Sequence, residues 1–125
     1  MQYEIKQQDK FKYLEEGSGE PLVLLHGLFG ALSNFASLIE YFRQYNKVVV
    51  PILPLLEMDI LHTSVGGLAK FVNRFLEARD LQGVNLLGNS LGGHVGLIHT
   101  LKHPERIKSL ILTGSSGLFD PFGMF

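Results

Sequence analysis

The sequence contains no cysteine, which excludes disulfide bonds, thiolate metal sites and cysteine nucleophiles together. It also has no excess of one charge, since 11 Lys and Arg face 12 Asp and Glu. The basic footprint of a nucleic-acid-binding protein is therefore missing. No apolar run approaches the roughly 20 residues that span a bilayer, and the polar start over residues 1–10 is unlike a secretory signal. We expect a cytoplasmic protein that binds neither nucleic acid nor membrane.

Motifs for cofactors are missing as well. The sequence has neither the G-x-x-x-x-G-K-[ST] pattern of a phosphate loop nor the G-x-G-x-x-G pattern of a dinucleotide site. Glu57 and Asp59 resemble a carboxylate pair, but they lie in an expected loop, and no cluster of histidines accompanies them. We therefore expect no cofactor and no metal.

What is present suits one compact domain of 125 residues, 46% of them hydrophobic. Two short strand-like runs, 3–7 and 11–15, predict an N-terminal hairpin within 1–16. Strand and helix patterns then alternate over 21–116, and an apolar tail follows over 117–125. The expected strands are 21–25, 47–50, 84–87 and 109–113, and the expected helices are 35–42 (with Ser33 as its N-cap), 64–79 and 91–103. This alternation predicts an α/β fold with a mostly parallel sheet of about six strands and helices on both faces.

A sharp turn is expected between the strand at 84–87 and the helix at 91–103. The sequence there, Gly88-Asn89-Ser90-Leu91-Gly92-Gly93, satisfies the G-x-S-x-G pattern of a nucleophile elbow. Glycines two residues before and two after the serine remove side chains that would clash in such a turn. The following helix directs free N–H groups towards an oxygen that becomes negative during nucleophilic attack. The pattern alone is weak evidence, and its position between strand and helix strengthens it.

A second diagnostic segment follows the first apolar strand. It is His26-Gly27-Leu28-Phe29-Gly30, a glycine-bearing turn that can present backbone N–H groups to the same oxyanion. With this segment, the order of elements resembles the α/β-hydrolase superfamily up to about residue 116. The form of the two motifs is similar to the branch of small esterases and hydrolases of meta-cleavage products.

The resemblance implies a role for each residue of these motifs. Ser90 would be the nucleophile, and the N–H groups of Leu91 and of Phe29 or Leu28 would form the oxyanion hole. His26 would hold the loop in a structural role. The implied activity is hydrolysis of a small ester or a related acyl or carbonyl substrate. The glycines that shape the elbow and the loop would be Gly88, Gly92, Gly93, Gly27 and Gly30.

The base and the acid of a catalytic triad are not evident in the sequence. Related enzymes usually carry them after the seventh and eighth strands, and this sequence ends just beyond the sixth. Asp120 is a candidate acid, although an aspartate before a proline is more often a turn former. The remaining histidines are better explained as packed or solvated residues than as the general base; they are His62, His94, His99 and His103. We expect the chain to be inactive alone.

The last strand-like segment, 107–114, would form an open sheet edge, because the lid and strands seven and eight of the family are not in this sequence. Long apolar edges tend to pair. We therefore expect a homodimer, formed through this strand or by exchange of the last segments. Two hypotheses stay open: a serine hydrolase that needs further parts for activity, or a catalytically silent fragment that acts as a self-associating folding or assembly module.

Overall fold

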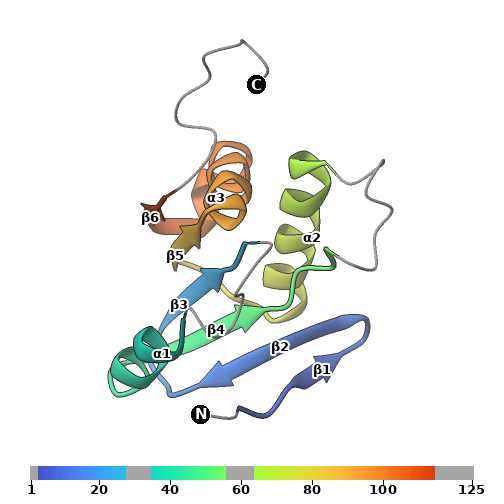
Figure 1. The fold of residues 1–125 in the computed structure, drawn as a ribbon. Coiled ribbons are helices and arrows are strands. Elements are labelled where there is room, and N and C mark those ends of the chain that lie inside the picture. Colours follow the sequence, from blue (N-terminus) through green and yellow to red (C-terminus); the bar gives the residue numbers. More distant parts are fainter. Residues whose placement is uncertain (1–2, 28–34, 56–63, 115–125) are drawn as a thin grey trace.

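The computed structural model describes residues 3–27, 35–55 and 64–114. In this part of the chain six strands form one sheet, and helices cover both of its faces (Figure 1). The strands are β1 (Lys6–Gln8), β2 (Phe11–Glu16), β3 (Glu20–Leu25), β4 (Asn46–Pro51), β5 (Val84–Asn89) and β6 (Ile107–Thr113). The helices are α1 (Ala36–Phe42), α2 (Val65–Ala78), α3 (Leu91–Lys102) and the short 3-10 helix η2 (Pro104–Arg106). The expected α/β fold with a mostly parallel sheet is confirmed.

The N-terminal hairpin is present, but its first strand is shorter than the sequence predicts. β1 pairs antiparallel with β2, and Gln8 lies opposite Phe11 across a two-residue turn. The expected start of this strand at Tyr3 is wrong, because β1 begins at Lys6. The Tyr3 hydroxyl instead donates a hydrogen bond to Glu40 Oε1 on α1, at 2.8 Å. The segment before β1 thus contacts a residue that is 37 positions away in the sequence.

The order of strands across the sheet is β1-β2-β4-β3-β5-β6. The four strands on one side of the sheet, β4, β3, β5 and β6, run parallel to one another. On the other side, β2 pairs antiparallel with β4, and β1 pairs antiparallel with β2. β3 is thus flanked by the strand that follows it and by β5, so the order of strands reverses at β3. In open α/β sheets, ligands bind outside the carboxyl ends of the strands at such a reversal.

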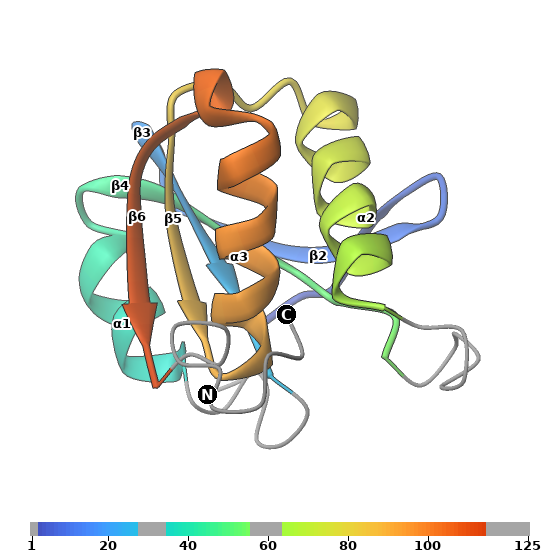
Figure 2. The same ribbon diagram turned by 90° about the horizontal axis from the view of Figure 1, so that it is seen from above.

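One face of the sheet carries α2 and α3, which lie side by side in Figure 2. The buried stripe of α2 is the one that the sequence predicts, because Leu68, Val72 and Phe75 are all buried. Phe75 stacks edge-on against Phe11 of β2, with 5.7 Å between the ring centroids. The N-terminus of α2 is capped by Ser64, whose Oγ accepts a hydrogen bond from the Gly67 N–H at 2.9 Å.

The opposite face of the sheet packs against α1. Phe35 and Ile39 are buried there, together with Leu24, Val48 and Val50 of the central strands. Helix α1 begins at Ala36 with Phe35 in the N-cap position. Ser33, the expected N-cap, lies outside the described residues, as does the tail over 117–125.

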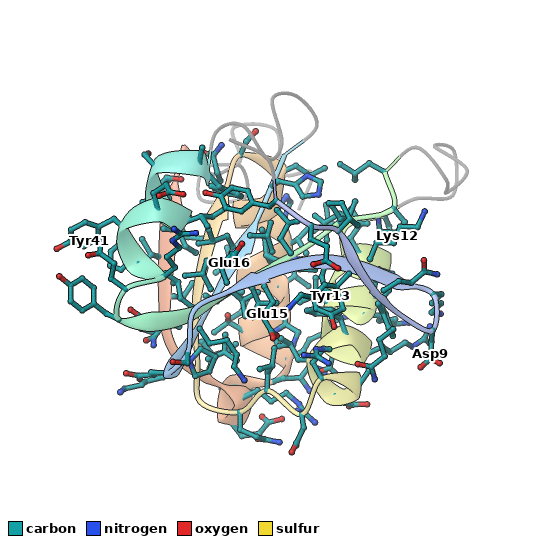
Figure 3. All side chains as sticks on the ribbon, turned by 90° about the horizontal axis from the view of Figure 1, so that it is seen from below. Asp9, Lys12, Tyr13, Glu15, Glu16 and Tyr41 are labelled. Carbon is teal, nitrogen blue, oxygen red and sulfur yellow. The ribbon has the colours of Figure 1, made fainter. Side chains whose placement is uncertain are left out.

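The hairpin is tied to the end of α2 by Arg79. Its guanidinium donates to Gln8 Oε1 and to Glu15 Oε1, both at 2.9 Å, and lies over the ring of Tyr13 at 4.7 Å from the centroid. Figure 3 labels Tyr13 and Glu15 on β2. Both charged side chains of the Arg79–Glu15 ion pair are largely shielded from solvent. The pair joins the hairpin to the end of α2, two elements that are far apart in the sequence.

β6 lies at one side of the sheet, as Figure 2 shows beside β5. Within the described ranges it pairs with β5 on one side only. None of its residues is fully buried, and the side chain of Ile111 is 45% exposed. No helix in the described part of the chain combines the length and the apolar character needed to cross a membrane.

Candidate active site

Ser90 lies on a tight turn between β5 and α3, at the carboxyl end of the parallel strands. Its backbone has φ 56° and ψ −122°. A positive φ of this kind is unfavourable for a residue with a side chain and costs about 1–3 kcal/mol. The side chain of Ser90 is exposed although the strand before it is buried. The turn therefore lifts a hydroxyl out of the sheet at the expense of local strain.

Glycines on both sides allow the turn to be this tight. A Cβ placed on Gly88 would come within 2.4 Å of the Gly92 carbonyl oxygen and 2.6 Å of the Gly93 Cα. A Cβ on Gly92 would lie 2.1 Å from the carbonyl oxygen of Leu25. No heavy atom tolerates such distances. The expectation that these positions have no room for a side chain agrees with this geometry.

The segment after β3 passes directly beside Ser90. A Cβ on Gly27 would lie 3.1 Å from the Ser90 Cβ and 3.4 Å from its Oγ. The backbone of the H-G segment and the serine hydroxyl are thus neighbours, although 63 positions of sequence separate Gly27 from Ser90 (90 − 27). The assignment of the H-G segment to an oxyanion hole stays a prediction.

His26 fixes the position of this segment. Its Nε2 accepts a hydrogen bond from the Leu53 N–H at 2.9 Å, so Nδ1 carries the proton and donates to the Gly27 carbonyl oxygen at 2.8 Å. Burial, the largest cause, lowers the pKa of the His26 ring from its usual 6.5, and the hydrogen bond to the Gly27 carbonyl opposes this shift only in part. A neutral imidazole with both nitrogens engaged joins the loop after β3 to the segment after β4. The structural role of His26 in an oxyanion loop stays a prediction.

The other side of the turn is held by β6. The Ser90 N–H donates to the carbonyl oxygen of Thr113 at 3.1 Å, and the Thr113 hydroxyl donates to Asn89 Oδ1 at 3.0 Å. The sequence reasoning missed both Asn89 and Thr113. A signal does exist, because polar residues recur four apart in each strand: Asn85 and Asn89 in β5, and Ser109 and Thr113 in β6. Its meaning depends on the register, which the sequence does not reveal.

Helix α3 begins directly after the serine, at Leu91. The N–H groups of Gly93 and His94 donate to the Ser90 carbonyl oxygen at 3.0 and 3.4 Å. The first N–H groups of a helix have no acceptor within the helix and carry a partial positive charge. The start of α3 therefore presents a favourable environment for negative charge beside Ser90.

Three further histidines occupy α3 and its end. His94 is buried one turn after Ser90. His99 is also buried, two turns into the helix, and its Nε2 donates to Asn73 Oδ1 of α2 at 3.1 Å. His103, at the C-terminal end of the helix, lies 3.5 Å from a Glu105 carboxylate oxygen. His99 and His103 therefore belong to the end of α3 that lies away from the turn.

Several residues weighed from the sequence lie outside the described residues. They are Leu28, Phe29, Gly30, Glu57, Asp59, His62 and Asp120. Within the described ranges, no group of three or more His, Asp or Glu side chains is arranged to hold a metal ion.

Chemically, the described arrangement joins three features. It has an exposed hydroxyl on a strained turn, a helix N-terminus beside it, and a second backbone segment so near that a Cβ on Gly27 would lie 3.4 Å from the hydroxyl oxygen. Attack of a hydroxyl on a carbonyl carbon produces an oxyanion, and backbone N–H groups near the nucleophile stabilise it. The site also lies at the carboxyl ends of β3 and β5, where the order of strands reverses.

Comparison with known proteins agrees with this arrangement. A family model described as the alpha/beta hydrolase fold matches residues 20–125. A solved structure of an α/β-hydrolase enzyme from the metagenome of lagoon sediments at Mar Chica, Morocco, is 49% identical with a TM-score of 0.87. That alignment covers 94% of this chain and 54% of the other.

Two curated relatives have different activities in their names. A 2-hydroxy-6-oxo-6-(2'-aminophenyl)hexa-2,4-dienoic acid hydrolase of Metapseudomonas resinovorans is 34% identical, over 86% of this chain and 39% of its own length. Lipase 1 of Psychrobacter immobilis is 30% identical, over 89% of this chain and 37% of its own length. This chain thus spans well under half the length of either relative. Its sequence and its fold both identify it as a member of the α/β-hydrolase family.

Proposed function

We propose that the chain carries the nucleophile of a serine hydrolase and that Ser90 is this nucleophile. The observation that supports the proposal best is the turn itself: Ser90 is exposed at positive φ between Gly88 and Gly92, neither of which has room for a Cβ. In the proposed reaction, Ser90 Oγ attacks the carbonyl carbon of a small ester, and a base accepts the hydroxyl proton. The leaving alcohol takes that proton, and water later releases the acid from the acyl-enzyme.

The proposed oxyanion hole uses the N–H of Leu91 and that of Phe29 or Leu28. Leu91 is the first residue of α3, so its N–H belongs to the positive end of the helix. The proposal for Phe29 or Leu28 is supported by Gly27, whose backbone lies beside Ser90 Oγ. His26 would keep this segment in place through its bonds to Gly27 and Leu53.

The proposed reaction also needs a histidine base and a carboxylate that orients it. His26 is not suited to the role, because both its ring nitrogens are engaged within the loop. His94 is buried within α3, and His99 and His103 belong to the far end of that helix. We therefore propose that residues 1–125 alone do not hydrolyse esters and that activity requires a base from another polypeptide segment.

Covalent labelling by a fluorophosphonate tests both parts of this proposal. The chain is incubated with the probe alone, and again with a segment made of the C-terminal half of the 49% identical metagenomic hydrolase. Intact mass then reports phosphonylation. We expect no labelling of the chain alone and labelling of Ser90 in the mixture, because a base must activate the hydroxyl.

Ser90→Ala is the control for the site of labelling. Labelling of the mixture that persists in this variant would contradict the assignment of Ser90. Rapid labelling of the chain alone that disappears in Ser90→Ala would support the nucleophile and contradict the proposed inactivity.

A second candidate function is self-association through β6, favoured by the edge of this strand that has no strand partner within residues 3–27, 35–55 and 64–114. β6 has seven residues of mostly apolar character. A two-fold antiparallel pairing centred on Leu110 would set Ser109 opposite Ile111 and Lys108 opposite Leu112, so no like charges would meet. Such pairing would satisfy the free N–H and C=O groups of the edge.

Size-exclusion chromatography with light scattering tests the association at micromolar concentration. We expect a species of twice 13.9 kDa and its conversion to the single-chain mass by Ile111→Lys. Ile5→Lys is a matched control, because Ile5 is similarly exposed (48%) and lies outside β6. A wild-type chain that stays at 13.9 kDa would refute the proposal.

A further inference from the structure

Two similar side-chain pairs join β5 to β6. The Ser109 hydroxyl donates to Asn85 Oδ1 at 2.6 Å, and the Thr113 hydroxyl donates to Asn89 Oδ1 at 3.0 Å. Both pairs are formed by residues that lie opposite each other in the parallel register. The first pair lies near the start of the strands, while the second lies at their carboxyl ends, next to Ser90. The two pairs have the same chemistry and differ in their distance from the elbow.

Thr113 contacts the elbow through its carbonyl oxygen and through its hydroxyl, which lies 3.0 Å from Asn89 Oδ1 and 3.5 Å from the Gly88 carbonyl oxygen. Its carbonyl oxygen accepts the hydrogen bond of the Ser90 N–H, and its hydroxyl holds the side chain of Asn89, the residue before the serine. A strained backbone persists only where its surroundings fix it. On the helix side, the Ser90 carbonyl oxygen accepts bonds from Gly93 and His94. On the strand side, Thr113 supplies the acceptor for the Ser90 N–H and the hydroxyl that contacts Asn89.

We propose that Thr113 is a positioning residue for Ser90, acting through Asn89 and through the carbonyl group that accepts the Ser90 N–H. The inference rests on the proposed role of Ser90 as nucleophile. Thr113 touches no reacting atom in this scheme. Its hydroxyl keeps the end of β6 in register with Asn89, and this register keeps the Thr113 carbonyl under the Ser90 N–H. Loss of the hydroxyl would let the end of the edge strand separate from β5, which would relax the elbow.

Hydrogen exchange of the Ser90 amide, measured by NMR on the chain itself, tests the proposal directly. Thr113→Val removes the hydroxyl while keeping a β-branched side chain of similar size. We expect the Ser90 amide to exchange about five- to tenfold faster in this variant, the effect of one hydrogen bond. Thr113→Ser restores the hydroxyl and should return exchange to within about twofold of wild type.

Ser109→Ala is the matched control, because it removes the equivalent hydroxyl from the same strand pair. We expect it to accelerate exchange near Asn85 and to leave the Ser90 amide within about twofold of wild type. Equal acceleration at Ser90 by Ser109→Ala and Thr113→Val would mean general fraying of β6 and would overturn the proposal. An unchanged Ser90 amide in Thr113→Val would overturn it as well.

Labelling of Ser90 in the mixture with the C-terminal segment separates this inference from the proposed function. We expect Thr113→Val to slow labelling by about five- to tenfold and Thr113→Ser to restore the rate. If labelling proceeds at the wild-type rate in Thr113→Val, the nucleophile assignment stands and the positioning role fails. If no variant is labelled while exchange at Ser90 still responds to Thr113 alone, the positioning of the turn stands and the proposed chemistry fails.

Discussion

Replacement of Gly92 by alanine is expected to destabilise the domain strongly. The new Cβ would lie 2.1 Å from the Leu25 carbonyl oxygen and 2.7 Å from that of His26, about 1 Å or more inside ordinary contact for the closer atom. Both atoms are backbone, so α3 has to move away from β3. We assign the upper end of the overpacking range, about 3 kcal/mol. The higher helix propensity of alanine offsets about 1 kcal/mol.

The net loss is then about 2 kcal/mol, which corresponds to about 8 °C in Tm for a domain of this size. Gly96→Ala is the matched control, one turn further along the same helix. Its Cβ would meet side-chain atoms of Leu86, Leu110 and Leu25 at 3.4–3.6 Å, so we expect unchanged or slightly raised stability. Urea unfolding followed by circular dichroism measures both. Equal stability of Gly92→Ala and Gly96→Ala would refute the packing argument.

Two other predictions concern buried polar contacts. Burial, the largest cause, lowers the pKa of His99 from 6.5 to about 4. The contribution of the neutral ring to stability is therefore complete above pH 6.5 and is lost as the pH falls towards 4. We expect the unfolding free energy to fall by up to about 3 kcal/mol over that range. His99→Gln should flatten this part of the pH profile, and a profile unchanged from wild type would contradict the assignment. Arg79→Lys should lower the unfolding free energy by about 1–2 kcal/mol through loss of the two-pronged contact with Gln8 and Glu15. The exposed Arg43, at 3.8 Å from Glu40, provides the control, and Arg43→Lys should change stability by less than about 0.5 kcal/mol.

Most elements of the fold could be predicted from the sequence because their patterns are local. The apolar run over residues 22–25 is buried throughout, as a strand covered on both faces requires. The stripe of α2 follows from its helical period. The order of strands is different, since β2 pairs with β4 rather than with its sequence neighbour β3. That choice depends on packing between distant segments, which local periodicity does not encode.

The site shows the same division. The glycines around Ser90 are visible as a motif because their role is steric and their spacing is fixed. The contacts of Thr113 with the elbow are not visible, because they depend on the register of β6 against β5. The partner of His26 could not be predicted from the sequence for a similar reason, since the N–H that donates to its ring belongs to Leu53, 27 residues away.

The two edges of the sheet differ in a way that bears on how far assembly can proceed. β1, at one edge, has three polar residues, Lys-Gln-Gln, and short polar edges resist addition of further strands. β6, at the other edge, is longer and mostly apolar. If two copies pair through β6, each uses the only long, mostly apolar edge strand in the described part of the chain. The joined sheet of twelve strands (6 + 6) then ends in β1 on both sides. The asymmetry would close the assembly at a pair and oppose growth into a fibre.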